Sequence, residues 1–232
     1  MVFMAARAKR TERRTDALSK ERIVEAAIEI LDTDGEGALT FRALAARLAT
    51  GAGAIYWHVA GKDELLATAT GDVIARVMTG VSGGAEPREA IRALCLGLFD
   101  AIDAHPWVGT QLSREPWQPV VMEIFEGIGG RLPALGVPGP AQFDCASALL
   151  NYVLGLAAQY AAGARLLAGK TDRSTFLATI AARWAQLDPA QYPFVHRLAA
   201  QLPEHDDRDQ FLAGVDLILA GIARLDPKSA PN

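Results

Sequence analysis

The sequence has little cysteine and few aromatic residues. Cys95 and Cys145 are its two cysteines among 232 residues, and phenylalanine, tryptophan and tyrosine together make up 7%. Two thiols cannot supply a disulfide scaffold or a four-cysteine metal site, so we expect two small buried thiols in a reducing compartment. The four histidines, at 58, 105, 196 and 205, show no spacing typical of a metal-binding pair, and we predict neither a metal nor a cofactor.

Long apolar runs are also missing. The most apolar stretch, residues 146–167, is interrupted by Asn151, Gln159 and Arg165, whereas a membrane-spanning helix needs about 20 mainly apolar residues. The first residues contain no apolar signal core. The sequence therefore predicts a soluble cytoplasmic protein without a membrane segment.

The net charge of −4 is unevenly distributed. Residues 1–22 hold seven Lys or Arg and three Asp or Glu. Residues 63–232, by contrast, hold thirteen Lys or Arg and nineteen Asp or Glu. Residues 1–18 are predicted to be a flexible basic arm. Such an arm either contacts a polyanion such as DNA or is a solvated tail.

Strand patterns are nearly absent, whereas apolar residues recur at helical spacing along most of the chain. The predicted fold class is therefore all-α, with a three-helix head over residues 19–66 and a larger helical body over residues 67–232. Helices in the head are expected at 20–33, 41–48 and 54–58, and a long helix from 62 to about 79 joins the head to the body. Those in the body are expected at 87–104, 106–113, 117–131, 140–168, 173–186, 192–201 and 207–225.

Two short helices joined by a tight turn, Ala49-Thr50-Gly51, predict a helix-turn-helix motif behind the first helix. In that motif the second short helix enters the major groove of DNA. A three-helix head of this kind can also bind a protein, so the pattern alone leaves both possibilities open.

Three segments resemble the DNA-binding domain of the tetracycline repressor (TetR) family: Leu39–Ala45, Ala54–Val59 and Lys62–Leu66. The resemblance covers roughly residues 19–66, and residues 104–106 and 211–219 are more loosely similar to the effector-binding domain of that family. The resemblance implies a homodimeric transcriptional regulator, most often a repressor, that binds a palindromic operator in double-stranded DNA and is released by a small molecule.

The resemblance also implies which residues contact DNA. Thr40, Tyr56 and Lys62 match positions that hold the DNA backbone, and Arg42 matches one that reaches a base edge or a phosphate. Trp57 and His58 belong to the same motif, although Tyr56 and Trp57 could instead be core aromatics, His58 a packed or capping residue and Arg42 a solvated one. The remaining candidates, which offer few side-chain hydrogen bonds, are Thr50, Gly51, Ala52, Gly53 and Ala54. We therefore expect thymine-methyl contacts from the alanines, close backbone approach at the glycines, and specificity from Arg42, Thr50 and DNA shape.

The predicted effector site is a mostly apolar pocket with a few polar anchors, formed by the body. The candidates are Phe99, His105, Trp107, Gln111, Trp117, Met122, Phe125, Asn151 and Gln159. His105 matches a functional histidine of the tetracycline repressor, but Met78 stands where a second histidine would be needed, so a tetracycline–magnesium ligand is not expected. Each aromatic residue could instead belong to the core, His105 could cap a helix, and Asn151 could bond across a dimer.

A homodimer is expected through helices 140–168 and 207–225. Phe211, Val215, Ile218, Ile222 and Leu225 follow one another at alternating spacings of four and three, which is typical of a helix seam. The seam could equally pack inside one subunit.

An enzyme is not expected. Residues 80–84 match the G-x-S-x-G nucleophile motif, but that motif needs a strand before it and a helix after it, and here a helix precedes a loop. A helical enzyme or a protein-interaction scaffold remains the alternative to a DNA-binding regulator.

Overall fold

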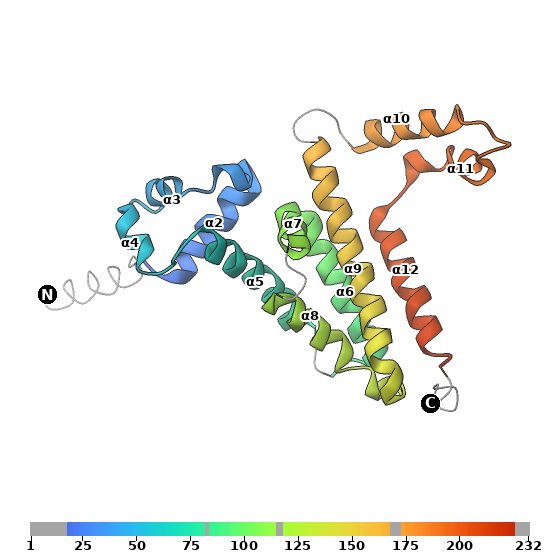
Figure 1. Cartoon of the computed structure of the whole chain (residues 1–232), viewed down its shortest axis with the longest axis horizontal. Coiled ribbons are helices and arrows are strands. Elements are labelled where there is room, and N and C mark those ends of the chain that lie inside the picture. Colours follow the sequence, from blue (N-terminus) through green and yellow to red (C-terminus); the bar gives the residue numbers. More distant parts are fainter. Residues whose placement is uncertain (1–17, 82–83, 115–117, 168–172, 226–232) are drawn as a thin grey trace, which may run out of the picture. The chain divides into compact units, whose positions relative to one another are not determined.

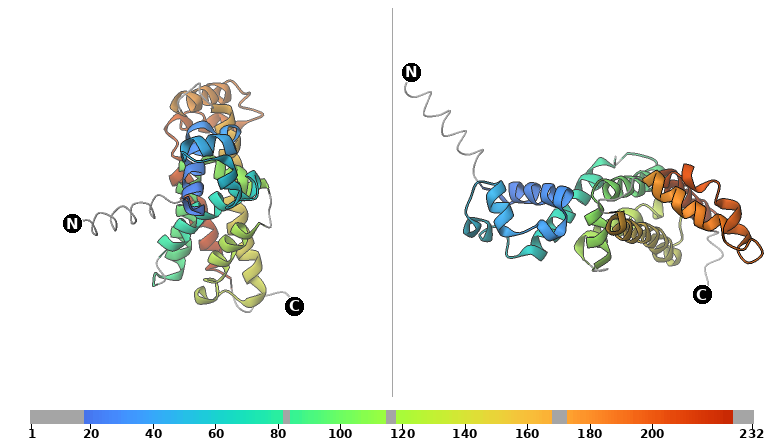
Figure 2. Two further views of the ribbon diagram at one scale, coloured as in Figure 1. Left: turned by 90° about the vertical axis from the view of Figure 1, so that its left-hand side faces the viewer. Right: turned by 90° about the horizontal axis from the view of Figure 1, so that it is seen from above.

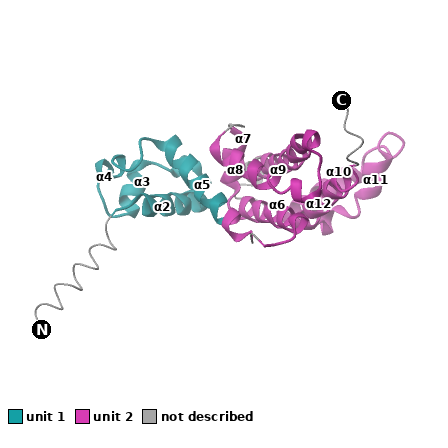
Figure 3. Ribbon diagram, turned by 90° about the horizontal axis from the view of Figure 1, so that it is seen from below, with its two compact units in different colours: residues 1–76 teal, residues 77–232 magenta. Residues whose placement is uncertain are grey.

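The computed structural model describes residues 18–81, 84–114, 118–167 and 173–225. The basic arm, up to residue 17, and Trp117 lie outside these ranges, as does Ser82 of the G-x-S-x-G match. All regular elements of the described ranges are helices, which confirms the predicted fold class. The chain divides into two compact units, residues 1–76 and 77–232, and the division falls inside one helix, ten residues beyond the expected boundary (Figure 3).

Unit 1 begins with helix α2 (Lys20–Asp34), which matches the predicted range 20–33 to within one residue. The Ser19 hydroxyl accepts a hydrogen bond from the Arg22 N–H at 3.3 Å, which satisfies one free donor of the first turn. The helix ends at Gly35, whose φ of +76° is accessible to glycine at little steric cost. A short 3-10 helix, η1 (Glu36–Ala38), then leads into the next element.

The helix-turn-helix consists of α3 (Phe41–Arg47) and α4 (Ala52–Tyr56), followed by α5 (Lys62–Gly80). The three helices are labelled in Figure 1. Leu44 and Ile55 are fully buried and, with Leu39 and Leu65, belong to the core that fixes the two short helices. Ala49, with φ +50°, makes the tight turn, and the Thr50 N–H donates to the Ala45 carbonyl at 2.9 Å. Gly51 has φ −86° and is the N-cap of α4, so the left-handed residue of this turn is an alanine rather than the glycine.

Unit 2 contains seven further helices in the described part of the chain, which can be followed in Figures 1 and 2. They are α6 (Pro87–Ala104), α7 (Pro106–Arg114), α8 (Pro119–Gly129), α9 (Gly139–Leu167), α10 (Arg173–Ala185), α11 (Pro193–Leu198) and α12 (Asp207–Ile222). Four of them start at a proline, which has no N–H to leave unpaired in the first turn. The predicted ranges are closely matched, except that α8, α11 and α12 are shorter at one or both ends.

Helix α9 is the centre of unit 2, in contact with α6, α7, α8 and α12. Gly109 of α7 lets that helix approach closely, because a Cβ there would lie 2.5 Å from the Ala157 carbonyl oxygen. Gly214 of α12 does the same, since its Cβ would lie 2.0 Å from the Tyr152 hydroxyl. The Tyr152 ring stacks on Phe211, with the centroids 5.1 Å apart, so these residues fix how α9 and α12 meet.

Two ion pairs join α6 and α12 in antiparallel register. Arg92 pairs with Asp216 at 3.1 Å, and Arg208 pairs with Asp100 at 2.8 Å. Each helix supplies one arginine and one aspartate, and in both helices the arginine precedes the aspartate by the same number of residues. A parallel arrangement would place like charges opposite each other, so the pattern favours the observed direction. None of the described helices is both long and apolar enough to cross a membrane.

Candidate functional site

The end of α4 presents two aromatic side chains to solvent. Trp57 is 90% exposed and Tyr56 is 57% exposed, which contradicts the alternative that they are core aromatics. The Tyr56 ring lies flat on Phe41 of α3, with the centroids 4.2 Å apart and the planes within 5°. This stacking holds the phenol in a fixed direction, so its hydroxyl is available without further ordering.

The frame around α4 is held by bonds within unit 1. The Thr40 hydroxyl accepts from the Ala43 N–H at 3.1 Å and caps α3. The Lys62 ammonium donates to the Glu36 carbonyl at 2.6 Å, which ties the start of α5 to η1. Thr40 and Lys62 therefore have structural roles as well as predicted DNA contacts, and the sequence alone did not reveal the Lys62 bond.

Glu64 stabilises the loop that leads out of α4. Its carboxylate accepts from the Ala60 N–H at 2.7 Å and from the Lys20 ammonium at 2.9 Å. The Ala60 N–H, and then Lys20, hold the pKa of the Glu64 carboxyl below its usual value. One side chain thus links α2, α5 and the loop that carries His58, which is half-buried.

Helix α4 has little side-chain volume at its exposed face. A Cβ at Gly51 or Gly53 would meet nothing within 4 Å, so the fold itself does not require glycine at either position. Ala52, Ala54 and Thr50 are half-buried. The backbone of this helix is therefore accessible to a large partner.

Two arginines of α3 differ in how they are held. Arg47 pairs with Glu29 at 2.9 Å. Arg42 is exposed and has no hydrogen-bond or ion-pair partner among the residues that the structure describes. Arg42 is thus the α3 cation whose donors are available to an external anion.

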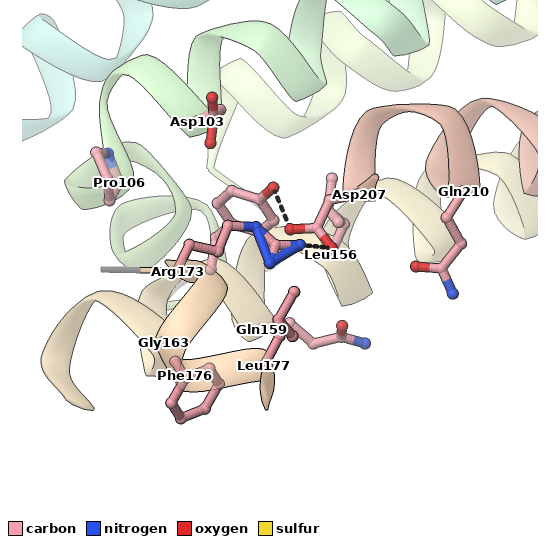
Figure 4. Close-up of a pocket in the computed structure, with 11 residues that line it drawn as sticks. Asp103, Pro106, Leu156, Gln159, Gly163, Arg173, Phe176, Leu177, Asp207 and Gln210 are labelled. Atoms are coloured by element: carbon pink, nitrogen blue, oxygen red, sulfur yellow. Dashed lines mark hydrogen bonds and ion pairs between the residues drawn. The ribbon is translucent and has the colours of Figure 1, made fainter. Parts of the chain in front are cut away.

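Unit 2 contains a partly open cavity of about 390 Å³, which falls within the size range of small-molecule sites. Its walls come from α6, α7, α9, α10 and α12, elements far apart in the sequence (Figure 4). Leu156, Pro106, Phe176 and Leu177 supply the apolar surface, and the polar lining residues are Asp103, Gln159, Tyr160, Arg173, Asp207 and Gln210.

Asp207 organises the polar side of this cavity. Its carboxylate accepts from the Tyr160 hydroxyl at 3.2 Å and pairs with Arg173 (Figure 4). His205 Nε2 lies 3.2 Å from the same carboxylate. Burial, together with the nearby Asp207 and Asp103 carboxylates, raises the pKa of Tyr160. Tyr160 is therefore a neutral hydrogen-bonding group at physiological pH.

A smaller cavity of about 210 Å³ adjoins the first, and the two share Leu156, Gln159 and Gln210. Its remaining lining residues are Asn151, Tyr152, Gly155 and Phe211. Together the two cavities follow the α9–α12 crossing.

The predicted effector residues are only partly gathered at these cavities. Gln159 lines both and Asn151 lines the smaller one. His105 is the C-cap of α6, between the lining residues Asp103 and Pro106, and its ring meets Trp107 edge-on. Phe99 is buried, where it contacts Tyr160 and Phe211 from the core side.

The other predicted effector residues do not line a described cavity. Trp107 and Gln111 are buried in α7, Met122 is half exposed on α8, and Phe125 packs on Phe143. Tyr160, Arg173 and Asp207 were missed. The available signal was Tyr160, a tyrosine within a mainly apolar helix. Its partners Asp207 and Arg173 lie on other helices, so no local sequence pattern joins the three residues.

The face of α12 that is buried within the subunit contains most of the predicted seam. Phe211, Val215 and Ile222 pack inside unit 2, while Leu225 is 42% exposed. The intramolecular alternative therefore accounts for these three residues. Two other stripes of helical spacing are exposed instead, namely Ala148, Asn151, Gly155 and Ala158 on α9, and Ala213, Leu217 and Ala220 on α12.

Comparison with family models gives two matches that follow the two units. Residues 23–69 match the bacterial regulatory proteins of the tetR family, and residues 83–225 match the tetracyclin repressor-like C-terminal domain. The second match alone covers more than half of the chain.

Individual relatives agree with these matches. An HTH-type transcriptional regulator from Saccharopolyspora erythraea is 33% identical over 64% of this chain and 64% of its own length. A solved TetR regulator of Streptomyces coelicolor, SCO7222, is 51% identical, with a TM-score of 0.78 over 89% of this chain and 98% of the other. The Streptomyces coelicolor protein ActR in complex with actinorhodin is 26% identical, with a TM-score of 0.69 over 89% of this chain and 97% of the ActR chain.

Proposed function

Since the chain belongs to the tetR family of bacterial regulatory proteins, we propose that it is a transcriptional repressor whose homodimer binds a near-palindromic operator and is released by a small, largely apolar ligand. The observation that carries this proposal is the exposed end of α4. A 90% exposed tryptophan beside a stacked, exposed tyrosine has no role in the core of unit 1. Large aromatic side chains held rigidly in solvent are typical of a contact surface.

In the proposed complex, α4 lies in the major groove. Tyr56, Trp57 and Thr40 contact the DNA backbone, and Arg42 reaches a phosphate or a guanine edge with its unpaired guanidinium. The Lys62 ammonium donates one hydrogen bond to the Glu36 carbonyl, and its other N–H groups donate to a DNA phosphate. Ala52 and Ala54 touch thymine methyl groups, and Thr50 and His58 lie at the edges of the contact.

Gly51 and Gly53 let the backbone of α4 approach the bases closely, because neither is required by contacts inside unit 1. A Gly53→Ala variant tests this role. The added methyl group stabilises α4 by up to about 1 kcal/mol in the free protein, and we expect operator affinity to fall in a gel-shift titration. A control variant, Gly37→Ala, also adds a methyl group in open space, but outside α4. Equal affinities for Gly53→Ala and the wild type would contradict close approach.

We place the dimer interface on the exposed stripes of α9 and α12 rather than on the buried seam. The α9 stripe consists of small residues around Asn151, which would let two copies pack closely and bond through the amide. A two-fold dimer would space two α4 helices roughly 34–36 Å apart, one turn of DNA. The effector is proposed to bind in the cavity of unit 2.

Release is proposed to follow from a shift between two conformations of the dimer, only one of which spaces the α4 helices correctly. Helix α5 starts in unit 1 and ends in unit 2, so it is the direct covalent route between cavity and DNA contact. A coupling of about 1–3 kcal/mol would weaken operator binding about 5- to 150-fold.

The test is a gel-shift titration of the full chain on the DNA upstream of its own gene, with sedimentation of the free protein and of the complex. We expect a retarded complex containing two protein chains per operator, and footprinting should protect two half-sites about one turn apart. Operator scanning should then find weak discrimination at bases that face residues 51–54. A protein that retards neither this DNA nor a genomic fragment library would contradict the proposed function.

A further inference from the structure

We propose that the ligand of the larger cavity is an amphipathic organic cation, an apolar body that carries a protonated amine, and that Asp103 binds the amine. This inference rests on the proposed function only in taking that cavity as the effector site. It is carried by the balance of charges around the cavity.

Among the described residues that line the cavity, one is basic and two are acidic, and they differ in how many partners they have. Arg173 is already paired with Asp207. Asp207 also accepts from Tyr160 and lies 3.2 Å from His205 Nε2, so its oxygens are occupied. Asp103 has no hydrogen-bond or ion-pair partner among the residues that the structure describes, so one negative charge is left over.

The apolar side chains and the Asp103 carboxylate come from different elements of the lining. Leu156 comes from α9, and Phe176 and Leu177 come from α10, whereas Asp103 stands at the end of α6 (Figure 4). Helices α9 and α10 also supply polar lining residues, namely Gln159, Tyr160 and Arg173. The Gln159 amide likewise has no partner in the described part of the chain and can accept or donate. A ligand that matches both parts has an apolar body and a hydrogen-bond donor that can reach Asp103.

A cation fits this arrangement better than an anion. An anionic ligand at Arg173 would share that cation with the Asp207 carboxylate and would meet the repulsion of Asp207 and Asp103. An ammonium group leaves this network intact and gains a charge-assisted hydrogen bond at Asp103. A neutral alcohol would gain a weaker bond at the same oxygen.

Three probes with the same aromatic body separate these cases: anthracene-methylamine, anthracene-methanol and anthracene-carboxylate. Their binding to the full-length protein is measured without DNA, by equilibrium dialysis and by fluorescence. We expect the amine to bind about three- to tenfold more tightly than the alcohol, because the Asp103 side chain is exposed and partly screened. The carboxylate should bind most weakly.

The variant Asp103→Asn removes the carboxylate charge and keeps the shape of the side chain. Its affinity for the amine should fall to that for the alcohol, whereas alcohol binding should stay unchanged. The control Glu123→Gln neutralises an exposed carboxyl of α8 that does not line the cavity, and should leave all three affinities unchanged.

Equal affinity of the wild type for amine and alcohol, tighter binding of the carboxylate, or an unchanged amine affinity in Asp103→Asn would each overturn the proposal. Failure of all three probes to bind would also overturn it. Because these measurements omit DNA, they are independent of the gel-shift result, and either proposal can fail while the other stands.

Discussion

The two units of the chain build their functional surfaces in opposite ways. Unit 1 turns Arg42, Tyr56 and Trp57 outward from a short, continuous segment whose frame is fixed by local caps and by Glu64. Unit 2 turns Tyr160, Arg173 and Asp207 toward one another from three different helices. The difference follows from the partners: a DNA groove is read by one protruding element, whereas a small ligand must be surrounded.

This contrast predicts that unit 2 is the more sensitive to added volume. Gly214→Ala would place a methyl group 2.0 Å from the Tyr152 hydroxyl and break the stacking on Phe211. We expect a loss of about 3 kcal/mol in the free energy of unfolding, measured by urea denaturation with circular dichroism.

The matched control for that variant is Gly221→Ala in the same helix, where a Cβ meets nothing within 4 Å. There we expect no loss, and a gain of up to about 1 kcal/mol from helix propensity. Similar losses in both variants would mean that the Tyr152 contact does not fix the α9–α12 crossing.

Unit 1 should lose function rather than stability when a protruding group is removed. Arg42→Ala is expected to weaken operator binding by about 2 kcal/mol, within the usual 1–3 kcal/mol for such a contact, with unfolding unchanged. Arg47→Ala, on the same helix but paired with Glu29, should cost little affinity. Equal losses in the two variants would indicate a general charge effect instead of a specific Arg42 contact.

The basic arm also tests the comparison, because its residues precede α2 within the range of unit 1. Deletion of residues 1–14 removes five Lys or Arg, and we expect operator affinity to fall about tenfold and the salt dependence to become shallower by about 0.9 per lost phosphate contact. Deletion of residues 1–6 alone removes no charged side chain and is the control. A salt slope that is the same in all three proteins would leave the arm as a solvated tail.

The smallest expected effect concerns acid stability of unit 1. The pKa of Glu64 is lowered by the Ala60 N–H and Lys20, so its contribution is present above the unfolded value, about 4.3, and is lost as the pH falls through the folded pKa. Glu64→Gln should therefore be less stable than the wild type near pH 6, and the difference should shrink below about pH 4. Glu25→Gln, an exposed change on α2, should show no such trend in thermal melts.

The fold class, the family and most helix ranges were predictable from the sequence and are confirmed. Ser19, Thr40 and Gly35 show why: a cap acts on N–H groups three residues away or on its own φ, so the signal is local. The α4 motif was predictable for the same reason, since its residues are adjacent in the chain. The roles of its side chains at DNA stay predictions.

The sequence by itself therefore determined the helices and their caps, because each depends on residues within a turn or two. It left open whether Tyr56 and Trp57 are core aromatics, and the structure exposes both. Only the tertiary structure decided which face of α12 is buried, that Ala49 rather than Gly51 makes the turn, and that Tyr160, Arg173 and Asp207 meet in one cavity. These outcomes depend on which helices pack together and how closely. A periodic pattern states that a helix has an apolar face, but not which neighbour will cover it.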